Sequence, residues 1–171
     1  MAADAMKEQN SMKKFTAEVR SIWGDGKDPA FPFKVKGLLE KLLISANPQE
    51  RWIVQLIKDG LPARELYRDK DHGFLLMGHV LDRDHNNSPH DHGDFWVLYG
   101  VYHGVAEITI YRRMDDGKVS GRVLLEKKGL HRLTPGMVMA LFPGEAHSTF
   151  TVEPSVVFRF LSHELNEIGY C

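Results

Sequence analysis

The chain has 171 residues, and its 22 lysine and arginine residues nearly balance 23 aspartate and glutamate residues, for a formal net charge of −1. This balance excludes both the basic field of a nucleic-acid-binding protein and a polybasic membrane-binding segment. The apolar runs are far shorter than the roughly 20 residues that span a bilayer. The only cysteine is Cys171, so no internal disulfide can form, and a cytoplasmic location is expected.

The first 70 residues carry apolar side chains at helical spacing, which predicts helices. One helix is expected around Phe15 and Val19, and a second around Val35 and Leu39, with a glycine-rich loop between them. A third is expected to begin at 47–50, because asparagine, proline and glutamate stand there in the order of a helix cap. We expect these helices to cover another layer of structure.

From Gly73 onward the pattern changes to short strands separated by turn residues. The expected strands are 73–82, 95–102, 104–112, 121–127, 130–134, 137–142, 147–152 and 155–162. Many short strands at regular spacing favour a sandwich or barrel, and the jelly roll is one such closure. The prediction is a single, mainly β domain over 1–171, in which an N-terminal helical cover (1–70) precedes a jelly-roll β-barrel (71–165).

Two of the nine histidines stand two residues apart, His90 and His92. On a strand this spacing places both side chains on the same face, where they could point into a barrel. Imidazole is a good ligand for iron, zinc, nickel and copper. Taken alone, such a pair also arises by chance on an exposed face.

A third histidine, His147, follows a strand that is closed by Pro143 and Gly144. The two segments together resemble the motifs of the cupin superfamily, G-x5-HxH-x3,4-E-x6-G and G-x5-P-x-G-x2-H-x3-N. The residues that match are His90, His92, Gly104, Gly136, Gly144 and His147. The resemblance implies a metal site formed by His90, His92 and His147.

The chain departs from the first motif at its glutamate, because Val97 stands at that position. Three neutral histidines would leave the charge of a divalent cation uncompensated, which favours an anionic group supplied by a substrate. Fe(II) is the expected metal, with zinc, manganese or nickel as alternatives, since three histidines and a water also form a catalytic zinc site.

A three-histidine cupin preceded by helices is similar to the thiol dioxygenases, the group of cysteine dioxygenase and mercaptopropionate dioxygenase. The similarity covers roughly 62–165 and is clearest at 88–93 and 153–156. It implies that Arg68 matches the arginine that holds the substrate carboxylate, although an exposed surface arginine is an equal alternative. Val97 falls where some of these enzymes carry the cysteine of a Cys-Tyr crosslink, so no crosslink is expected.

The Ser-x-His-x-Tyr arrangement of those enzymes is absent from the last strand, where Val157, Arg159 and Leu161 stand instead. Arg159 lies in an otherwise apolar strand and is expected to point into the barrel, where it needs an acidic partner or an anionic ligand. Tyr99 and His103 share strand parity with Val97 and could line the pocket. The Tyr99 hydroxyl could orient substrate or oxygen, and the alternative is a core tyrosine.

The remaining histidines lack motif support and are expected to be structural or on the surface: His72, His79, His85, His131 and His163. Asp91 is expected to point outward. Asp94 could hydrogen-bond a ligand histidine, but an exposed loop position is the favoured interpretation.

The leading hypothesis is a non-haem Fe(II) dioxygenase that acts on a small thiol or organic acid and O2, with Arg68, Tyr99 and Arg159 as candidate substrate-contacting residues. A lyase, isomerase or hydrolase using zinc, manganese or nickel is the second hypothesis, and a non-catalytic small-ligand-binding protein is the third. A homodimer is plausible because exposed barrel edges need covering.

Overall fold

The computed structural model describes residues 10–25, 28–119 and 121–163, so Cys171 lies outside the described residues. Three helices precede the strands: α1 (Ser11–Ile22), α2 (Phe31–Ser45) and α3 (Arg51–Asp59). Eight strands follow: β1 (Arg64–Arg68), β2 (Leu75–Leu81), β3 (Val97–His103), β4 (Ala106–Arg113), β5 (Leu125–Leu133), β6 (Val138–Leu141), β7 (Ala146–Thr151) and β8 (Ser155–Leu161). None of the helices in the described part of the chain is long and apolar enough to cross a membrane.

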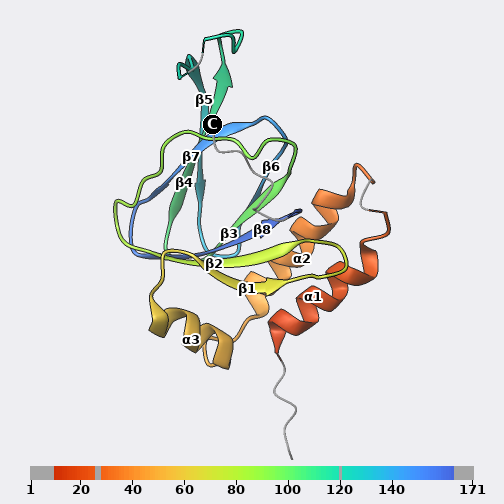
Figure 1. The fold of residues 1–171 in the computed structure, drawn as a ribbon. Helices are drawn as coiled ribbons and strands as arrows, with labels where there is room; N and C mark the ends of the chain where they lie inside the picture. The colour runs from red at the N-terminus through yellow and green to blue at the C-terminus, as the bar shows by residue number, and fades with distance from the viewer. Residues whose placement is uncertain (1–9, 26–27, 120, 164–171) are drawn as a thin grey trace, which may run out of the picture.

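The strands form two antiparallel sheets, one in the order β1-β2-β8-β3-β6 and the other in the order β5-β4-β7 (Figure 1). The segment 86–92 runs along the remaining edge of β7 and pairs with it at two isolated bridges, Asn86 with Phe150 and His90 with His147. When this segment is counted as a strand, the two facing layers have the strand orders β2-β8-β3-β6 and (segment 86–92)-β7-β4-β5. This is the strand order of a jelly roll, so the expected fold class is confirmed.

The five-stranded sheet is buried on both faces. Along β8, Phe158 and Phe160 point to the helices, where they join an outer core with residues such as Phe15 and Leu39. Val157 points to the opposite face and joins an inner core between the two sheets. This alternation follows from the two-residue period of a strand.

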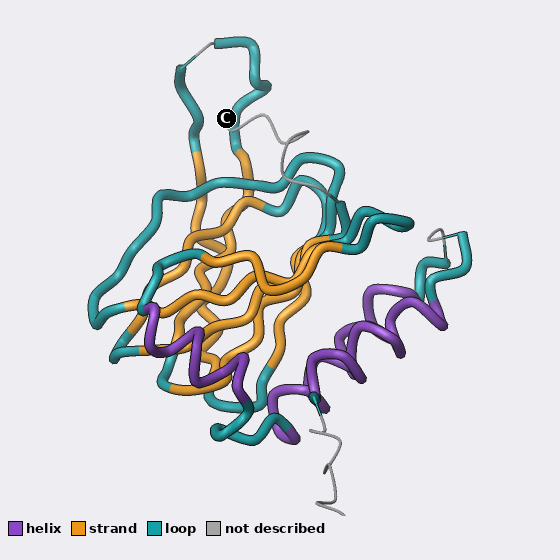
Figure 2. Tube along the Cα trace, turned by 60° about the horizontal axis from the view of Figure 1, so that its bottom comes forward, coloured by secondary structure: helices purple, strands orange, loops and turns teal. Residues whose placement is uncertain are grey.

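The helices lie on the side of the five-stranded sheet in both views (Figures 1 and 2). The close approach of α2 to β3 depends on Gly100, because an added Cβ there would lie 2.7 Å from Leu43 Cδ1 and 3.1 Å from Val138 Cγ2. The expected role of the helices as a cover therefore holds for the outer face of this sheet.

An ionic network ties α1 to the sheet. The carboxylate of Asp69 is fully buried and pairs with the Arg20 guanidinium. It also accepts hydrogen bonds from the Tyr67 hydroxyl at 2.9 Å and from the His72 amide at 2.8 Å. Arg20 additionally pairs with Asp71. The network joins the first helix to the turn between β1 and β2.

Three local expectations need correction. Residues 64–68, placed in the helical cover, form the edge strand β1, which is short and charged as edge strands often are. The separate strands 121–127 and 130–134 are one strand, β5, whose register shifts opposite Ile110 and Tyr111. Gly129 marks this β-bulge and not a turn. The third helix begins at Arg51 and not at 47–50, although the expected hydrogen bond from the Asn47 amide to the Glu50 side chain is present at 3.0 Å.

Gly104, one of the motif glycines, is required by the turn after β3. Its φ is +81°, and an added Cβ would lie 2.3 Å from Ser155 Oγ and 2.5 Å from the Pro154 carbonyl oxygen. We expect Gly104→Ala to destabilise the protein by about 2 kcal/mol, since both strain and overlap oppose the substitution. Urea unfolding measures this, with Gly121→Ala as the control, because that exposed glycine also has positive φ but no neighbour within 4 Å. Equal losses in the two variants would contradict the role of the close contact.

Candidate metal centre

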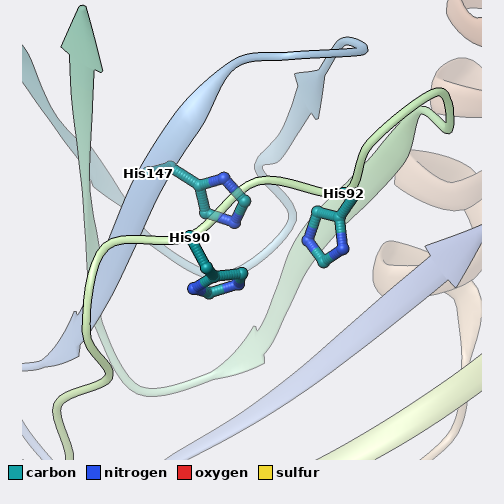
Figure 3. A group of neighbouring side chains, drawn as sticks. All are labelled: His90, His92 and His147. Atoms are coloured by element: carbon teal, nitrogen blue, oxygen red, sulfur yellow. The ribbon is translucent and has the colours of Figure 1, made fainter. Parts of the chain in front are cut away.

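The structure brings His90, His92 and His147 together on the inner side of the barrel (Figure 3). His147 lies at the start of β7, directly after the Pro143–Gly144 turn. His90 lies beside it, because its amide donates to the His147 carbonyl at 2.9 Å and the His147 amide donates back at 2.8 Å. His92 follows in the segment that leads to β3. The expected pairing of both HxH side chains at one site is confirmed, although the segment is an isolated bridge and not a regular strand.

The three imidazoles are close enough to share one ion. Their ring centroids are 4.5 Å apart for His90 and His147, 5.1 Å for His92 and His147, and 5.2 Å for His90 and His92. One nitrogen of each ring lies within 4.8 Å of the others. Small shifts of the side chains would allow each nitrogen to lie roughly 2.0–2.1 Å from a shared ion, which is the distance at which imidazole binds zinc.

Backbone carbonyls orient two of the rings. Nδ1 of His90 lies 2.9 Å from the Ser88 carbonyl oxygen, and Nδ1 of His147 lies 3.2 Å from that of Glu145. Because a carbonyl can only accept, Nδ1 donates in both contacts and Nε2 presents a lone pair. Carbonyls thus fill the role considered for Asp94, which is exposed. The Asp91 carboxylate accepts a hydrogen bond from the Gly93 amide at 2.8 Å.

Burial keeps two of the rings neutral. The pKa of His92 is lowered to about 3, mainly by burial and also by the positive charges that His147 and Arg159 can carry. Burial likewise lowers the pKa of His147 to about 4, against the raising effect of its bond to Glu145. Neutral imidazole is the form that binds metal.

The residues fit a divalent metal. Nε2 of His92 and Nε2 of His147 are both buried and have no hydrogen-bond partner, which is costly unless another group engages them. Within the described residues, this group of ligands contains no carboxylate. Val97, at the position of the motif glutamate, is fully buried in the inner core. The donor set is three neutral nitrogens, which suits iron, zinc, nickel or copper.

Of the other candidate residues, Tyr99 lies next to His147 and Arg159 lies next to Tyr99. The Tyr99 ring is 5.8 Å from that of His147 and packs edge-on to it. An Nη1–H of Arg159 donates to the Tyr99 hydroxyl at 3.4 Å. Arg159 therefore contacts the histidine cluster indirectly, through Tyr99. The strand register places Arg159 opposite Tyr99 and Met77, which agrees with the expectation that its side chain points into the barrel.

Arg68 lies at the rim. Its register partner on β2 is Leu75, an inner-core residue, so Arg68 is on the inner face of the edge strand. Its guanidinium is engaged by Glu65, with Nη2 at 2.7 Å from the carboxylate.

His103 does not line the inner face, contrary to its strand parity. A register shift between Val101 and His103 breaks the alternation, and His103 is exposed. His72 is structural, as expected, through its bonds to Asp69, while His85, His131 and His163 are exposed.

His79 lies on the inner face of the five-stranded sheet, a position that the sequence analysis did not identify. It lies opposite Val157, its Nδ1 donates to the Pro62 carbonyl at 2.7 Å, and its Nε2 is buried without a partner. Its parity with Met77 on β2 was the signal that could have revealed it.

Comparison with models of known families finds no match, and no curated protein sequence matches the chain. Among solved structures, BH2720 from Bacillus halodurans is 9% identical and has a TM-score of 0.52, covering 68% of this chain and 80% of that chain. KdgF from Halomonas sp. is 20% identical with a TM-score of 0.46, covering 61% and 82%. A cupin superfamily protein from Desulfitobacterium hafniense is 15% identical with a TM-score of 0.44, covering 60% and 76%. At these identities the likeness concerns the fold alone.

The strand order and the histidine cluster together define the class of the protein. It is a jelly roll that carries a cluster of three histidines suited to a divalent metal.

Proposed function

We propose that the protein is a metal-dependent enzyme of the three-histidine kind, a non-haem Fe(II) dioxygenase that acts on a small thiol or organic acid. The observation that carries this proposal is the convergence of His90, His92 and His147, two of which bury an unpartnered Nε2. A purely structural cluster would leave these nitrogens without any compensating interaction.

The charge of the site supports a substrate that binds as an anion. Three neutral imidazoles cannot compensate a divalent cation, and the cluster has no carboxylate among the described residues. When bound, iron supplies redox chemistry with O2 and polarises an anionic ligand. The chain supplies the fixed tautomers of His90 and His147, the apolar wall around Val97, and the ring of Tyr99 beside the cluster.

The similarity to thiol dioxygenases over 62–165 supports iron and O2, whereas Val157, Arg159 and Leu161 replace the residues with which those enzymes position substrate. These replacements support a substrate class, a small thiol or organic acid, and no particular member of it.

A second candidate is a zinc, manganese or nickel enzyme without O2 chemistry. It is favoured by the same donor set, because three histidines with one open position form a hydrolytic zinc site.

Metal analysis of protein purified without chelators, followed by oxygen measurements, tests the proposal. We expect nearly stoichiometric iron, and anaerobic Fe(II)-loaded protein should consume O2 only after addition of a small thiol or chelating acid. Full occupancy by zinc and indifference to O2 would favour the second candidate. An absence of metal after reconstitution with each of these ions would contradict both.

A further inference from the structure

Arg159 is a cation inside an apolar layer. Its neighbours two positions away on β8, Val157 and Leu161, both belong to the inner core. The register places Arg159 between Met77 on β2 and Tyr99 on β3, and these two residues are also inner-core members. Strand pairing on both sides of β8 therefore holds the side chain within the space between the two sheets.

The guanidinium has few partners there. Nη1 donates to the Tyr99 hydroxyl at 3.4 Å, and Nε is buried without a hydrogen bond. Across residues 10–25, 28–119 and 121–163, no carboxylate pairs with Arg159, whereas Arg20, Arg112 and Arg132 each pair with at least one. Arg159 is half-buried and its Nε is fully buried, and a charge in an apolar layer without a counter-charge is unfavourable, so this arrangement favours an anionic ligand.

Arg159 also lies within electrostatic reach of the histidines. Its charge contributes to the lowered pKa values of His92, His147 and His79, although burial is the largest cause in each. Tyr99 forms a direct link, since its hydroxyl meets Arg159 and its ring meets the ring of His147. The guanidinium and the three-histidine cluster are thus two positive ends of one site once the cluster holds a cation.

We propose that Arg159 and Tyr99 form an anion-binding subsite and that the ligand of the metal centre is a small dianion, with one anionic group at the metal and the other at Arg159. The inference rests on the proposed function. A divalent cation, a guanidinium and three neutral imidazoles carry three positive charges, of which a dianion compensates two. Arg68, the alternative anion-binding arginine, already pairs with Glu65 at the rim.

Anaerobic calorimetry on the Zn(II)-loaded protein tests this without relying on turnover. The probes are malonate, succinate and glutarate, each compared with the monocarboxylate of equal chain length: propionate, butyrate and valerate. The variants are Arg159→Met, which removes the charge at similar volume, and Tyr99→Phe, which removes one hydroxyl. Arg112→Met is the matched control, because Arg112 is exposed and paired with Glu126.

We expect one dicarboxylate to bind at least tenfold more tightly than its monocarboxylate, because its second carboxylate gains charge-assisted hydrogen bonds to the guanidinium. Arg159→Met should abolish this preference, Tyr99→Phe should reduce it, and Arg112→Met should retain it. A preference that survives Arg159→Met, or the lack of any preference in the unaltered protein, would overturn the inference. If Arg159→Met does not fold, Arg159→Lys replaces it and should weaken the preference, since lysine lacks the planar fork.

The two proposals fail in different ways. Failure to bind zinc or any other divalent ion would contradict the metal centre. The anion subsite is then judged on the metal-free protein, where carboxylate binding that is insensitive to Arg159→Met would overturn it. A dicarboxylate preference that is equal with and without zinc would overturn the dianion assignment while leaving the metal centre intact.

Discussion

Substitution of His147 by alanine is expected to lower the affinity for Fe(II) and Zn(II) by at least about a hundred-fold, because even the loss of an outer hydrogen-bond partner costs 10–100-fold. His147 is fully buried and holds the segment of the other two ligands through paired backbone bonds. Its imidazole supplies one of only three nitrogens in the cluster. Alanine preserves the backbone bonds and removes the nitrogen.

The measurement is metal titration followed by thermal unfolding. Metal at a hundred times its dissociation constant stabilises the unaltered protein by about 2.7 kcal/mol, and the His147→Ala variant should gain almost nothing. His131→Ala is the control, since His131 is an exposed residue outside the cluster. A metal-dependent stabilisation that persists undiminished in His147→Ala would exclude the three-histidine site.

Replacement of Asp69 by alanine is expected to cost about 3 kcal/mol of unfolding free energy, because it removes a buried acceptor that three donors share. Asp69 is fully buried, and its carboxylate accepts from Tyr67, His72 and Arg20. Urea unfolding at neutral pH measures the loss. Asp116→Ala is the control, since this exposed carboxylate pairs with Lys118 on the β4–β5 hairpin.

The same residue gives a pH dependence of defined sign. Burial raises the pKa of the Asp69 carboxyl, but hydrogen bonds from His72, Tyr67 and Arg20 outweigh burial and hold the pKa well below its usual value. The unfolded chain therefore binds the proton more readily, and the stability that Asp69 provides is present above about pH 4 and is lost as the pH falls further. Unfolding free energies measured from pH 6 to pH 2 should decline less in Asp69→Asn. An unchanged acid profile would contradict this assignment.

The clustering of the three histidines and the fold class could both be predicted from the sequence, and both for local reasons. The spacing of His90 and His92 and the turn before His147 are short-range features, and the jelly-roll topology does the rest by placing β7 beside the 86–92 segment. The positive φ of Gly104 is predictable for a similar reason, because it belongs to the tight turn between β3 and β4, whereas its contact with Ser155 depends on strands far apart in the sequence.

Features that depend on pairing partners were not predictable in this way. A one-residue register shift in β3 moves His103 to the surface, and a bulge makes β5 continuous where Gly129 resembled a break. Whether Arg159 pairs with a carboxylate depends on which strands lie beside β8. The sequence of β8 alone leaves two interpretations of Arg159 equally open, a structural ion pair and a contact with an anionic ligand. The pairing with β2 and β3 decides this, since Met77 and Tyr99 are its neighbours.

The division of the barrel into two sheets has a consequence for ligand length. His147 belongs to the three-stranded sheet and Arg159 to the five-stranded sheet, so a molecule that contacts both the metal and the guanidinium joins the two halves of the sandwich. Facing sheets pack about 10 Å apart, and the side chains from both faces occupy most of that distance. The distance between the sheets therefore determines how many bonds can separate the two anionic groups of the ligand. Substitutions in the inner core that increase or decrease this distance would change the preferred ligand length.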